Sequence, residues 1–352
     1  MIRRSNLALG WGIVSTGLHP ENKIAPAIAK AAGSELAAVY SRDPVRAKAF
    51  AEKHGAGAAY HDLDALLSDP QVDAVFIASP NSLHAQQGIQ AARAGKHVLV
   101  EKPMTTTLED GVALVRACRD QGVTLGVGFE LRHHPGHIFS RQQVAQGALG
   151  SITVAQAQWG FGVRAQEIPA PRTGLRSWWM QPEMIGGAAA IMGTGVHAVD
   201  LLRFLLGREV TEVAAITDGQ RQDQPLETVA AVSLRFDQGT IATICCGRTL
   251  PDSKNDFALY GINGRITGTK TLWEAQQGRV EMVSDAANFT QAYSGEYLGN
   301  FVAQMEDFSR AVDEDREPAA TGVDGLRVVE ITLAALQSAR EGHSVKVKPT
   351  PL

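Results

Sequence analysis

The chain has 352 residues, of which 44% are hydrophobic and 20% charged, so it is long enough for two domains that each bury a core. Its formal net charge of -4 is spread without a basic tract, which excludes nucleic acid and membrane surfaces as expected partners and favours small molecules. Its three cysteines form no disulfide framework or metal-binding pair. We expect a cytoplasmic protein, because a reducing compartment suits these cysteines and the first residues show neither a cleavage pattern nor a membrane-spanning length.

Short apolar runs alternate with stretches of helical period over the first 130 residues. The runs predict strands at 7–14, 35–40, 72–79, 97–101 and 124–129, and the helical stretches include 44–55, 83–96 and 108–122. This alternation is typical of a parallel sheet covered by helices, and right-handed crossovers make it doubly wound. We therefore predict an α/β class with a Rossmann dinucleotide-binding domain over 1–130.

The pattern changes near residue 150 to alternating strands, at 151–159, 228–236 and 240–246, the last two joined by a tight "DQG" turn. With a helix that begins near His197, they predict a second α+β domain over 131–352 with a large open antiparallel sheet. The closing helix at about 325–341 could pack back on the first domain. A cleft between the domains is the expected site, and the uncovered sheet face predicts a homodimer or homotetramer.

The turn after the first strand is in the position of a dinucleotide fingerprint. Such a turn brings the backbone and the helix amides close to the pyrophosphate. Gly17 fits the second glycine of G-x-G-x-x-G, but Ser15 replaces the first, and the loop that follows is longer and contains a proline. We expect Ser15, Thr16 and Gly17 to contact the cofactor, and the alternative is a plain strand-to-helix turn.

The end of the second strand indicates which nicotinamide cofactor is used. An acid at this tip would accept hydrogen bonds from a ribose 2'-hydroxyl, but Ser41 and Arg42 occupy it, and Arg46 follows one helical turn later. Arginine can bind a 2'-phosphate through its planar fork. We expect a preference for NADP(H), with NAD(H) possible, and the alternative is a pair of solvent-facing arginines.

Glu101 and Lys102 follow the fourth expected strand, at the edge where open α/β sheets bind ligands, and we expect both to lie against the cofactor, with Lys102 over the nicotinamide. A partly desolvated lysine there could hydrogen-bond a substrate hydroxyl or carbonyl and help to move a proton. The alternative is a surface lysine at a strand end.

Taken together, the segments "WGIVSTG", "AVYSRDPVRAKAFAEKHG", "VFIASPNSLHAQQGIQAARAGKHVLVEKP", "GFELRHHP", "GGAAAIMGTGVHAVDLLRFLLG" and "REPAATGVDGLRVVEITLAALQSAREGHSV" resemble the Gfo/Idh/MocA oxidoreductases. The resemblance covers nearly the whole chain. It implies a Rossmann domain, a C-terminal domain with a large open sheet, a nicotinamide cofactor and sugar or polyol substrates.

The resemblance also implies roles for individual residues. It makes Lys102 the catalytic lysine and His197 the catalytic histidine, and histidine can exchange a hydroxyl proton near neutral pH. Asp200 matches an acid that could orient either group. The cofactor-contacting turn after the third expected strand corresponds to Ser79, Pro80, Asn81 and His84.

Two departures from the family pattern affect the chemistry. Many members carry an aspartate four residues before the histidine, where this chain has Gly193, which supplies no proton acceptor. The usual Trp-Arg pair is here Trp178 and Trp179, so an aromatic face replaces a cationic contact. The tryptophans could line a sugar pocket or pack between domains.

The segment "RHHPGH" offers both a metal and a substrate interpretation. His133, His134 and His137 do not predict a metal site, because Pro135 interrupts the helical face and no nearby cysteine or acid completes the ligands. The family places this segment at the substrate, so Arg132 and His133 are candidate hydroxyl contacts, against plain loop or helix-start roles.

The combined prediction is a nicotinamide-dependent dehydrogenase or reductase that transfers hydride at a secondary alcohol or carbonyl of a sugar, polyol or related cyclic compound. Two alternatives stay open. The first is an NADP-binding sensor without catalysis, which the absence of an aspartate at Gly193 suggests. The second is a lyase or hydrolase that uses the nicotinamide transiently.

Overall fold

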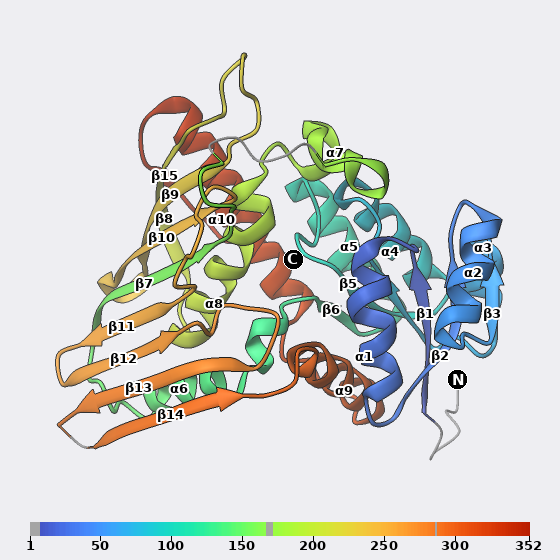
Figure 1. The fold of residues 1–352 in the computed structure, drawn as a ribbon, viewed down its shortest axis with the longest axis horizontal. Helices are drawn as coiled ribbons and strands as arrows, with labels where there is room; N and C mark the ends of the chain where they lie inside the picture. Colours follow the sequence, from blue (N-terminus) through green and yellow to red (C-terminus); the bar gives the residue numbers. More distant parts are fainter. Residues whose placement is uncertain (1–7, 167–171, 286) are drawn as a thin grey trace. The chain divides into compact units, whose positions relative to one another are not determined.

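The computed structural model describes residues 8–166, 172–285 and 287–352. The chain divides into two compact units, coloured along the sequence in Figure 1. The first unit comprises the chain up to Gly128, Phe301–Leu326 and Leu352, and the second comprises Phe129–Asn300 and Arg327–Pro351.

The first unit is built on a parallel sheet of six strands in the order β3-β2-β1-β4-β5-β6. This order reverses direction between β1 and β4, as in a doubly wound Rossmann sheet, so the predicted fold class is confirmed. Residue 7 of the first expected strand lies outside the described residues. The short β3 and helix α3 were not predicted. The strands are β1 (Leu9–Val14), β2 (Ser34–Tyr40), β3 (Ala58–Tyr60), β4 (Ala74–Ile77), β5 (His97–Val100) and β6 (Leu125–Val127).

Capping residues set the limits of the helices in this unit. Asp43 and Thr107 accept backbone hydrogen bonds at the starts of α2 and α5, and left-handed glycines end both helices. The segment from Phe301 returns to this unit, where Phe308 packs on Trp11 with ring centroids 5.3 Å apart. The helices are η1 (Pro20–Ile24), α1 (Ala25–Lys30), α2 (Pro44–His54), α3 (Leu63–Ser68), η2 (Asn81–Leu83), α4 (His84–Arg93), α5 (Leu108–Gln121), α9 (Gly299–Asp313) and the start of α10 (Gly322–Glu341).

The second unit contains a nine-stranded sheet in the order β14-β13-β12-β11-β7-β10-β9-β8-β15. All its neighbours are antiparallel except β7 and β10, so the sheet is mixed, whereas the sequence predicts an antiparallel one. The long connection after β7 includes helices and permits this parallel pair. The strands are β7 (Ile152–Gly160), β8 (Val210–Thr217), β9 (Val229–Phe236), β10 (Ile241–Gly247), β11 (Phe257–Gly261), β12 (Gly264–Thr269), β13 (Gln277–Ser284), β14 (Asn288–Ser294) and β15 (Val345–Lys346).

Helices cover one face of this sheet. Every residue of α8 is buried, and the helix packs on β7 and β10 because its sequence is apolar nearly all round. α10 also contacts the sheet, since Ser338 Oγ accepts a hydrogen bond from the Ala215 amide. The helical segments of this unit are η3 (Glu130–His133), α6 (Pro135–Ala145), η4 (Gly174–Met180), α7 (Pro182–Ile185), η5 (Ile191–Gly195), α8 (Val196–Leu206), η6 (Asp237–Gly239) and the rest of α10.

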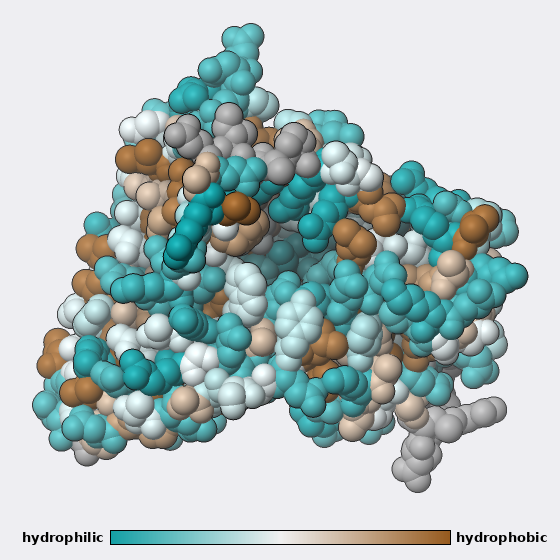
Figure 2. All heavy atoms as spheres, in the orientation of Figure 1, coloured by the Kyte–Doolittle hydropathy of each residue, from teal (hydrophilic) through white to brown (hydrophobic). Residues whose placement is uncertain are grey.

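Exposed apolar side chains form a row across the central strands of the nine-stranded sheet. Ile241 pairs with Val154, Val154 with Tyr260, Tyr260 with Arg265, and Arg265 with Val283. Directly opposite residues share a face, and the four apolar members of this row are exposed. In Figure 2, hydrophobic and hydrophilic residues are interspersed over the strands of this sheet. Across the part of the chain that the structure describes, no helix has the length and apolar character to cross a membrane.

Candidate functional site

The turn after β1 holds the backbone in a conformation that normally requires glycine. Ser15 has a φ of 123°, a left-handed value that is uncommon for a residue with a side chain. Its Oγ accepts a hydrogen bond from the Gly17 amide (3.3 Å), and Thr16 Oγ1 donates one to Ser41 Oγ (3.1 Å). Ser15 thus adopts the positive φ that the first glycine of the fingerprint would allow. The chain then continues into η1 and α1.

The tip of β2 combines two arginines with an acid. Ser41 is buried, Arg42 is exposed, and Asp43 caps α2 by accepting hydrogen bonds from two backbone amides. The other carboxylate oxygen of Asp43 accepts a hydrogen bond from Arg46 Nε (3.1 Å). The sequence interpretation considered only the tip itself and missed Asp43. Both of its oxygens are engaged with α2, so the acid neutralises Arg46 and caps the helix.

His84 joins the turn after β4 to the segment after β5. It is fully buried, with Nε2 2.9 Å from the Ser79 carbonyl oxygen and Nδ1 2.9 Å from the Pro103 carbonyl oxygen. Burial lowers the pKa of this histidine, although the two carbonyl oxygens act in the opposite direction. Pro80 precedes the short helix η2, in which Asn81 is buried. His84 therefore fixes two candidate cofactor-contacting segments relative to each other.

Glu101 connects the same segment to the loop after the first turn. Its Oε1 lies 2.8 Å from His19 Nε2, and its Oε2 accepts a hydrogen bond from the Lys102 amide (3.1 Å). Burial opposes ionisation of Glu101, but His19, Lys102 and His84 outweigh it, so its pKa is below the usual value. Lys102 is half-buried. His19 was missed by the sequence reasoning, which treated its loop only as an insertion.

In the second unit, His197 lies in the first turn of α8, directly after the π-helical turn η5. Its ring packs on Trp159 of β7, with centroids 4.3 Å apart. Nδ1 of His197 lies 3.4 Å from Glu130 Oε2, and both side chains are at most 5% exposed. The histidine is thus held between an aromatic ring and a carboxylate.

Asp200 binds Arg132 in this unit. Arg132 donates two hydrogen bonds to the carboxylate, from Nε (2.9 Å) and Nη2 (2.6 Å), and both side chains are almost wholly buried. Phe204 packs against the same guanidinium, with Cζ 5.3 Å from the ring centroid. The sequence reasoning expected Arg132 at the substrate and Asp200 as an orienting acid, and the structure brings the two together.

A buried carboxylate holds the segment that leads to His197. Glu227 accepts hydrogen bonds from the backbone amides of Ala189 (3.0 Å), Ala190 (2.8 Å) and Ile191 (2.8 Å). Burial raises the pKa of Glu227 although these donors lower it. Sequence reasoning missed this residue, because nothing local to "LETV" indicates that it caps a distant helical segment.

The glycines before His197 have different surroundings. A Cβ at Gly195 would lie 3.2 Å from Cys246 Sγ, so this glycine allows α8 to approach β10 closely. A Cβ at Gly193 would lie 3.8 Å from the Trp179 ring, an ordinary contact. Trp179 also packs on Trp178, with centroids 4.8 Å apart, and the Arg172 guanidinium lies 4.3 Å from the Trp179 ring centroid. Arg172 therefore brings a cation to the tryptophan pair, which the sequence interpretation described as aromatic alone.

In the segment "RHHPGH", His134 and His137 contact backbone groups. His134 is buried, accepts the Gly136 amide hydrogen bond at Nδ1 and donates from Nε2 to the Gln277 carbonyl oxygen (2.9 Å). Burial lowers its pKa to about 4. His137 Nδ1 lies 2.8 Å from the Leu131 carbonyl oxygen, and His133 is buried in η3. Within the described ranges, no group of three histidines, cysteines or acids could hold a metal ion.

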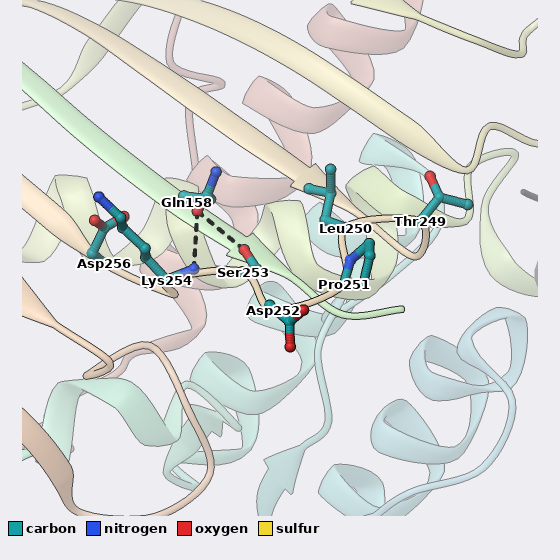
Figure 3. Close-up of a pocket in the computed structure, with 8 residues that line it drawn as sticks. All are labelled: Gln158, Thr249, Leu250, Pro251, Asp252, Ser253, Lys254 and Asp256. Atoms are coloured by element: carbon teal, nitrogen blue, oxygen red, sulfur yellow. Dashed lines mark hydrogen bonds between the residues drawn. The ribbon is translucent and has the colours of Figure 1, made fainter. Parts of the chain in front are cut away.

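A separate pocket of about 510 Å³ lies beside the loop after β10 (Figure 3). Gln158 Oε1 accepts hydrogen bonds there from Ser253 Oγ (3.1 Å) and the Lys254 amide (3.2 Å). The lining contains none of the predicted site residues and consists of Gln158, Thr249, Leu250, Pro251, Asp252, Ser253, Lys254 and Asp256.

The chain matches two family models that together span most of its length. Residues 9–129 match the NAD-binding Rossmann fold of the Gfo/Idh/MocA oxidoreductase family, and residues 141–347 match that family's C-terminal alpha/beta domain.

Named relatives and solved structures agree with these matches. The chain is 29% identical to 1,5-anhydro-D-fructose reductase of Ensifer adhaerens, over 96% of this chain and 98% of that protein. It is 30% identical to D-xylose 1-dehydrogenase (NADP(+)) 2 of Haloferax volcanii, over 96% and 99% of the two chains. The crystal structure of aldose-aldose oxidoreductase from Caulobacter crescentus, complexed with glycerol, superimposes with a TM-score of 0.86 at 28% identity, covering 97% of this chain and all of that one.

Proposed function

Because the chain belongs to the Gfo/Idh/MocA oxidoreductase family, whose members are NAD(P)-dependent, we propose that it transfers hydride at a secondary alcohol or carbonyl of a sugar, polyol or related cyclic compound. The observation that carries this proposal is the environment of His197, which is buried between Trp159 and the Glu130 carboxylate. A histidine paired in this way can exchange a hydroxyl proton. The relatives named for 1,5-anhydro-D-fructose, xylose and aldoses support the substrate class.

We assign proton transfer to Lys102 and His197. A bound nicotinamide would supply the position that accepts or releases hydride. The turn of Ser15, Thr16 and Gly17 would hold its pyrophosphate, with the turn after β4 and the segment at Glu101 beside it. The fit rests on the glycine-like backbone of Ser15 and on the buried hydrogen bonds that fix these segments.

On the substrate side, His133, Trp178 and Trp179 are the proposed contacts. The tryptophans pack on each other and are partly exposed, so they present an apolar surface on which a sugar ring can stack. We assign Arg132 to fixing η3 against α8, because it donates two hydrogen bonds to Asp200. Asp200 thus holds the backbone of η3 beside His197.

We further propose that NADP(H) is preferred. Arg42 is exposed at the tip of β2, beside the buried Ser41, where a ribose 2'-phosphate would lie in a Rossmann domain. Asp43 caps α2 and pairs with Arg46, so its carboxylate is committed to contacts within the helix. The name of the xylose dehydrogenase relative includes NADP(+), which agrees with this preference.

The test follows cofactor reduction by absorbance with a panel of aldoses, anhydrosugars and inositols. With the substrate that reacts, Lys102→Met and His197→Gln should each lower turnover by about a hundredfold or more, while cofactor binding by fluorescence is retained. Near-normal turnover in both variants would refute the assignment. A sensor would bind the cofactor without turnover of any substrate, and a lyase or hydrolase would form product without net cofactor change.

We also propose a homo-oligomer that buries the apolar row of the nine-stranded sheet. The row of Ile241, Val154, Tyr260 and Val283 lies on the face opposite the helices and is exposed in the single chain. Arg235, which pairs with Ile241 at one end of the row, forms an ion pair with Glu212. Arg265 lies within the row, between Tyr260 and Val283, and its charge is paired with Glu281.

A further inference from the structure

Glu130 and His197 form a buried acid-histidine pair that no sequence motif indicated. Glu130 Oε2 lies 3.4 Å from His197 Nδ1, with the two side chains 3% and 5% exposed. The distance is that of an ion pair, and the two atoms do not have hydrogen-bond geometry in the ligand-free protein. Contacts of this kind shorten when the imidazole gains a proton or a substrate binds.

Two acid-base pairs join the same two elements, η3 and α8. On η3, Glu130 faces His197 and Arg132 binds Asp200, while His197 and Asp200 lie within one turn of each other on α8. The bidentate Arg132–Asp200 pair fixes η3 against α8. This second contact restricts the Glu130 carboxylate to a position near the His197 ring.

The helix segment before His197 supplies no acid of its own. Gly193 lies one helical turn before the histidine and carries no side chain, and its nearest neighbour in the place of a Cβ is the Trp179 ring. From η5 to His197 the sequence is "IMGTGVH", which contains no carboxylate. Asp200, the carboxylate of α8, binds Arg132. The carboxylate found near Nδ1 of His197 is that of Glu130, from η3.

Several of the other charged or titratable groups on the elements around His197 have partners elsewhere. α8 packs on η3, η5, α6, β7 and β10. Arg203 pairs with Glu209, Arg141 donates to the Phe204 carbonyl oxygen, and His137 contacts the Leu131 carbonyl oxygen. His133 lies on η3 with its backbone in the helical turn. On β10, burial raises the pKa of Cys245 and Cys246, so both thiols stay protonated near neutral pH.

We propose that Glu130 is the positioning residue for His197, replacing an acid absent from the helix: its carboxylate accepts the Nδ1 proton, so that Nε2 exchanges the proton with the substrate hydroxyl. The inference rests on the proposed function. When the alcohol is oxidised, Nε2 takes the hydroxyl proton and Glu130 stays ionised beside the imidazolium, while a bound nicotinamide would accept hydride from the carbon that bears the hydroxyl. In reduction the same steps run in reverse.

The first test uses the ligand-free protein and needs no substrate. Nitrogen NMR of histidine-labelled protein, with the His197 signals identified by their loss in His197→Gln, reports which ring nitrogen carries the proton. The expected result is a proton on Nδ1 in the neutral ring. A neutral ring protonated on Nε2 in the wild-type protein overturns the proposal, and this measurement does not depend on the folding of any Glu130 variant.

The second test compares Glu130→Gln, Glu130→Asp and the control Glu341→Gln, which removes an acid from an exposed pair with His343. Loss of the carboxylate should move the midpoint of the His197 titration down by about one pH unit. The aspartate variant should lie between wild type and Glu130→Gln, and the control should match wild type. An unchanged midpoint in folded Glu130→Gln contradicts the proposal.

Kinetics then separate this inference from the proposed function. With a substrate found in the panel, Glu130→Gln should lower kcat by about tenfold or more, leave KM within about threefold, and shift the acid limb of the pH profile to lower pH. If His197→Gln is inactive but Glu130→Gln keeps the wild-type kcat and profile, only the role of Glu130 fails. If His197→Gln is fully active, the proposed function itself fails.

Discussion

Arg132 of η3 and Asp200 of α8 form a bidentate ion pair in which the side chains are only 5% and 1% exposed. The pair joins a short turn after the Rossmann sheet to the helix that carries His197. Burial makes the pair costly to break, since either charge left alone has no solvent to replace its partner. The geometry around His197 therefore depends on a contact between two residues that are 68 positions apart in the sequence.

The first prediction concerns the stability that this pair provides. Asp200→Asn should lower the free energy of unfolding by about 3–5 kcal/mol, because it leaves the Arg132 guanidinium buried without its counter-charge. Urea denaturation followed by circular dichroism measures the change. The matched control is Asp252→Asn, which breaks an ion pair with Arg164 whose side chains are 63% and 81% exposed, and it should cost less than about 1 kcal/mol. Equal losses in the two variants would show that burial does not determine the effect.

The second prediction concerns pH and the buried His134. Its pKa is lowered to about 4 by burial, so the neutral form stabilises the fold above the usual histidine value near 6.5, and that stability is lost as the pH falls toward 4. A shift of this size corresponds to about 3 kcal/mol. The free energy of unfolding should therefore fall less from pH 7 to pH 4 in His134→Gln than in the wild type. The difference between the two decreases should be at most about 3 kcal/mol. Parallel urea titrations at the two pH values measure it, and an identical pH dependence in both proteins would contradict the burial argument.

The third prediction concerns cofactor choice at the tip of β2. Arg42→Ala should raise KM for NADP+ by about tenfold or more and leave KM for NAD+ within about twofold, because a charge-assisted hydrogen bond to the 2'-phosphate is lost. Arg46→Ala should have a smaller effect, since Arg46 already pairs with Asp43. Arg119→Ala, near the end of α5, is the control. A wild-type enzyme that clearly uses NAD+ better than NADP+ would disprove the preference.

The fourth prediction concerns the sheet face. Val154→Glu introduces a charge in the middle of the apolar row, between Ile241 and Tyr260, and should reduce the mass measured by sedimentation to that of a single chain or a smaller assembly. Val154→Thr keeps the shape and adds only a hydroxyl, so it should retain the wild-type mass at the same concentration. A wild-type protein that sediments as a monomer would exclude the proposed interface directly.

Much of the first unit could be predicted from sequence because most of its strands are short, largely apolar runs followed by a segment of helical period. The runs at 72–79 and 97–101 contain the observed β4 and β5. The three-residue β3 was missed because its residues are only partly buried and carry little pattern. In the second unit, β14 is mostly exposed and polar, so its sequence lacks the apolar alternation that identifies a strand.

The candidate site was predictable only where a motif is local. Ser15, Lys102 and His197 each lie at a recognisable junction of strand, turn and helix. Glu130, Glu227 and His19 do not, because each acts through a partner far along the chain. Such pairings depend on the tertiary fold, which the periodicity within one segment does not indicate.

Ser15 shows how a nucleotide loop can keep its form while its sequence changes. A non-glycine residue at a φ of 123° costs on the order of 1–3 kcal/mol, and the Oγ contact with the Gly17 amide offsets part of that cost. Glycine here would relax the backbone but lose this contact and enlarge the range of conformations open to the unfolded chain. A dinucleotide-binding turn can thus be built without the first glycine of the fingerprint. A search for G-x-G-x-x-G alone misses a chain in which a serine adopts the positive φ and its hydroxyl binds the turn.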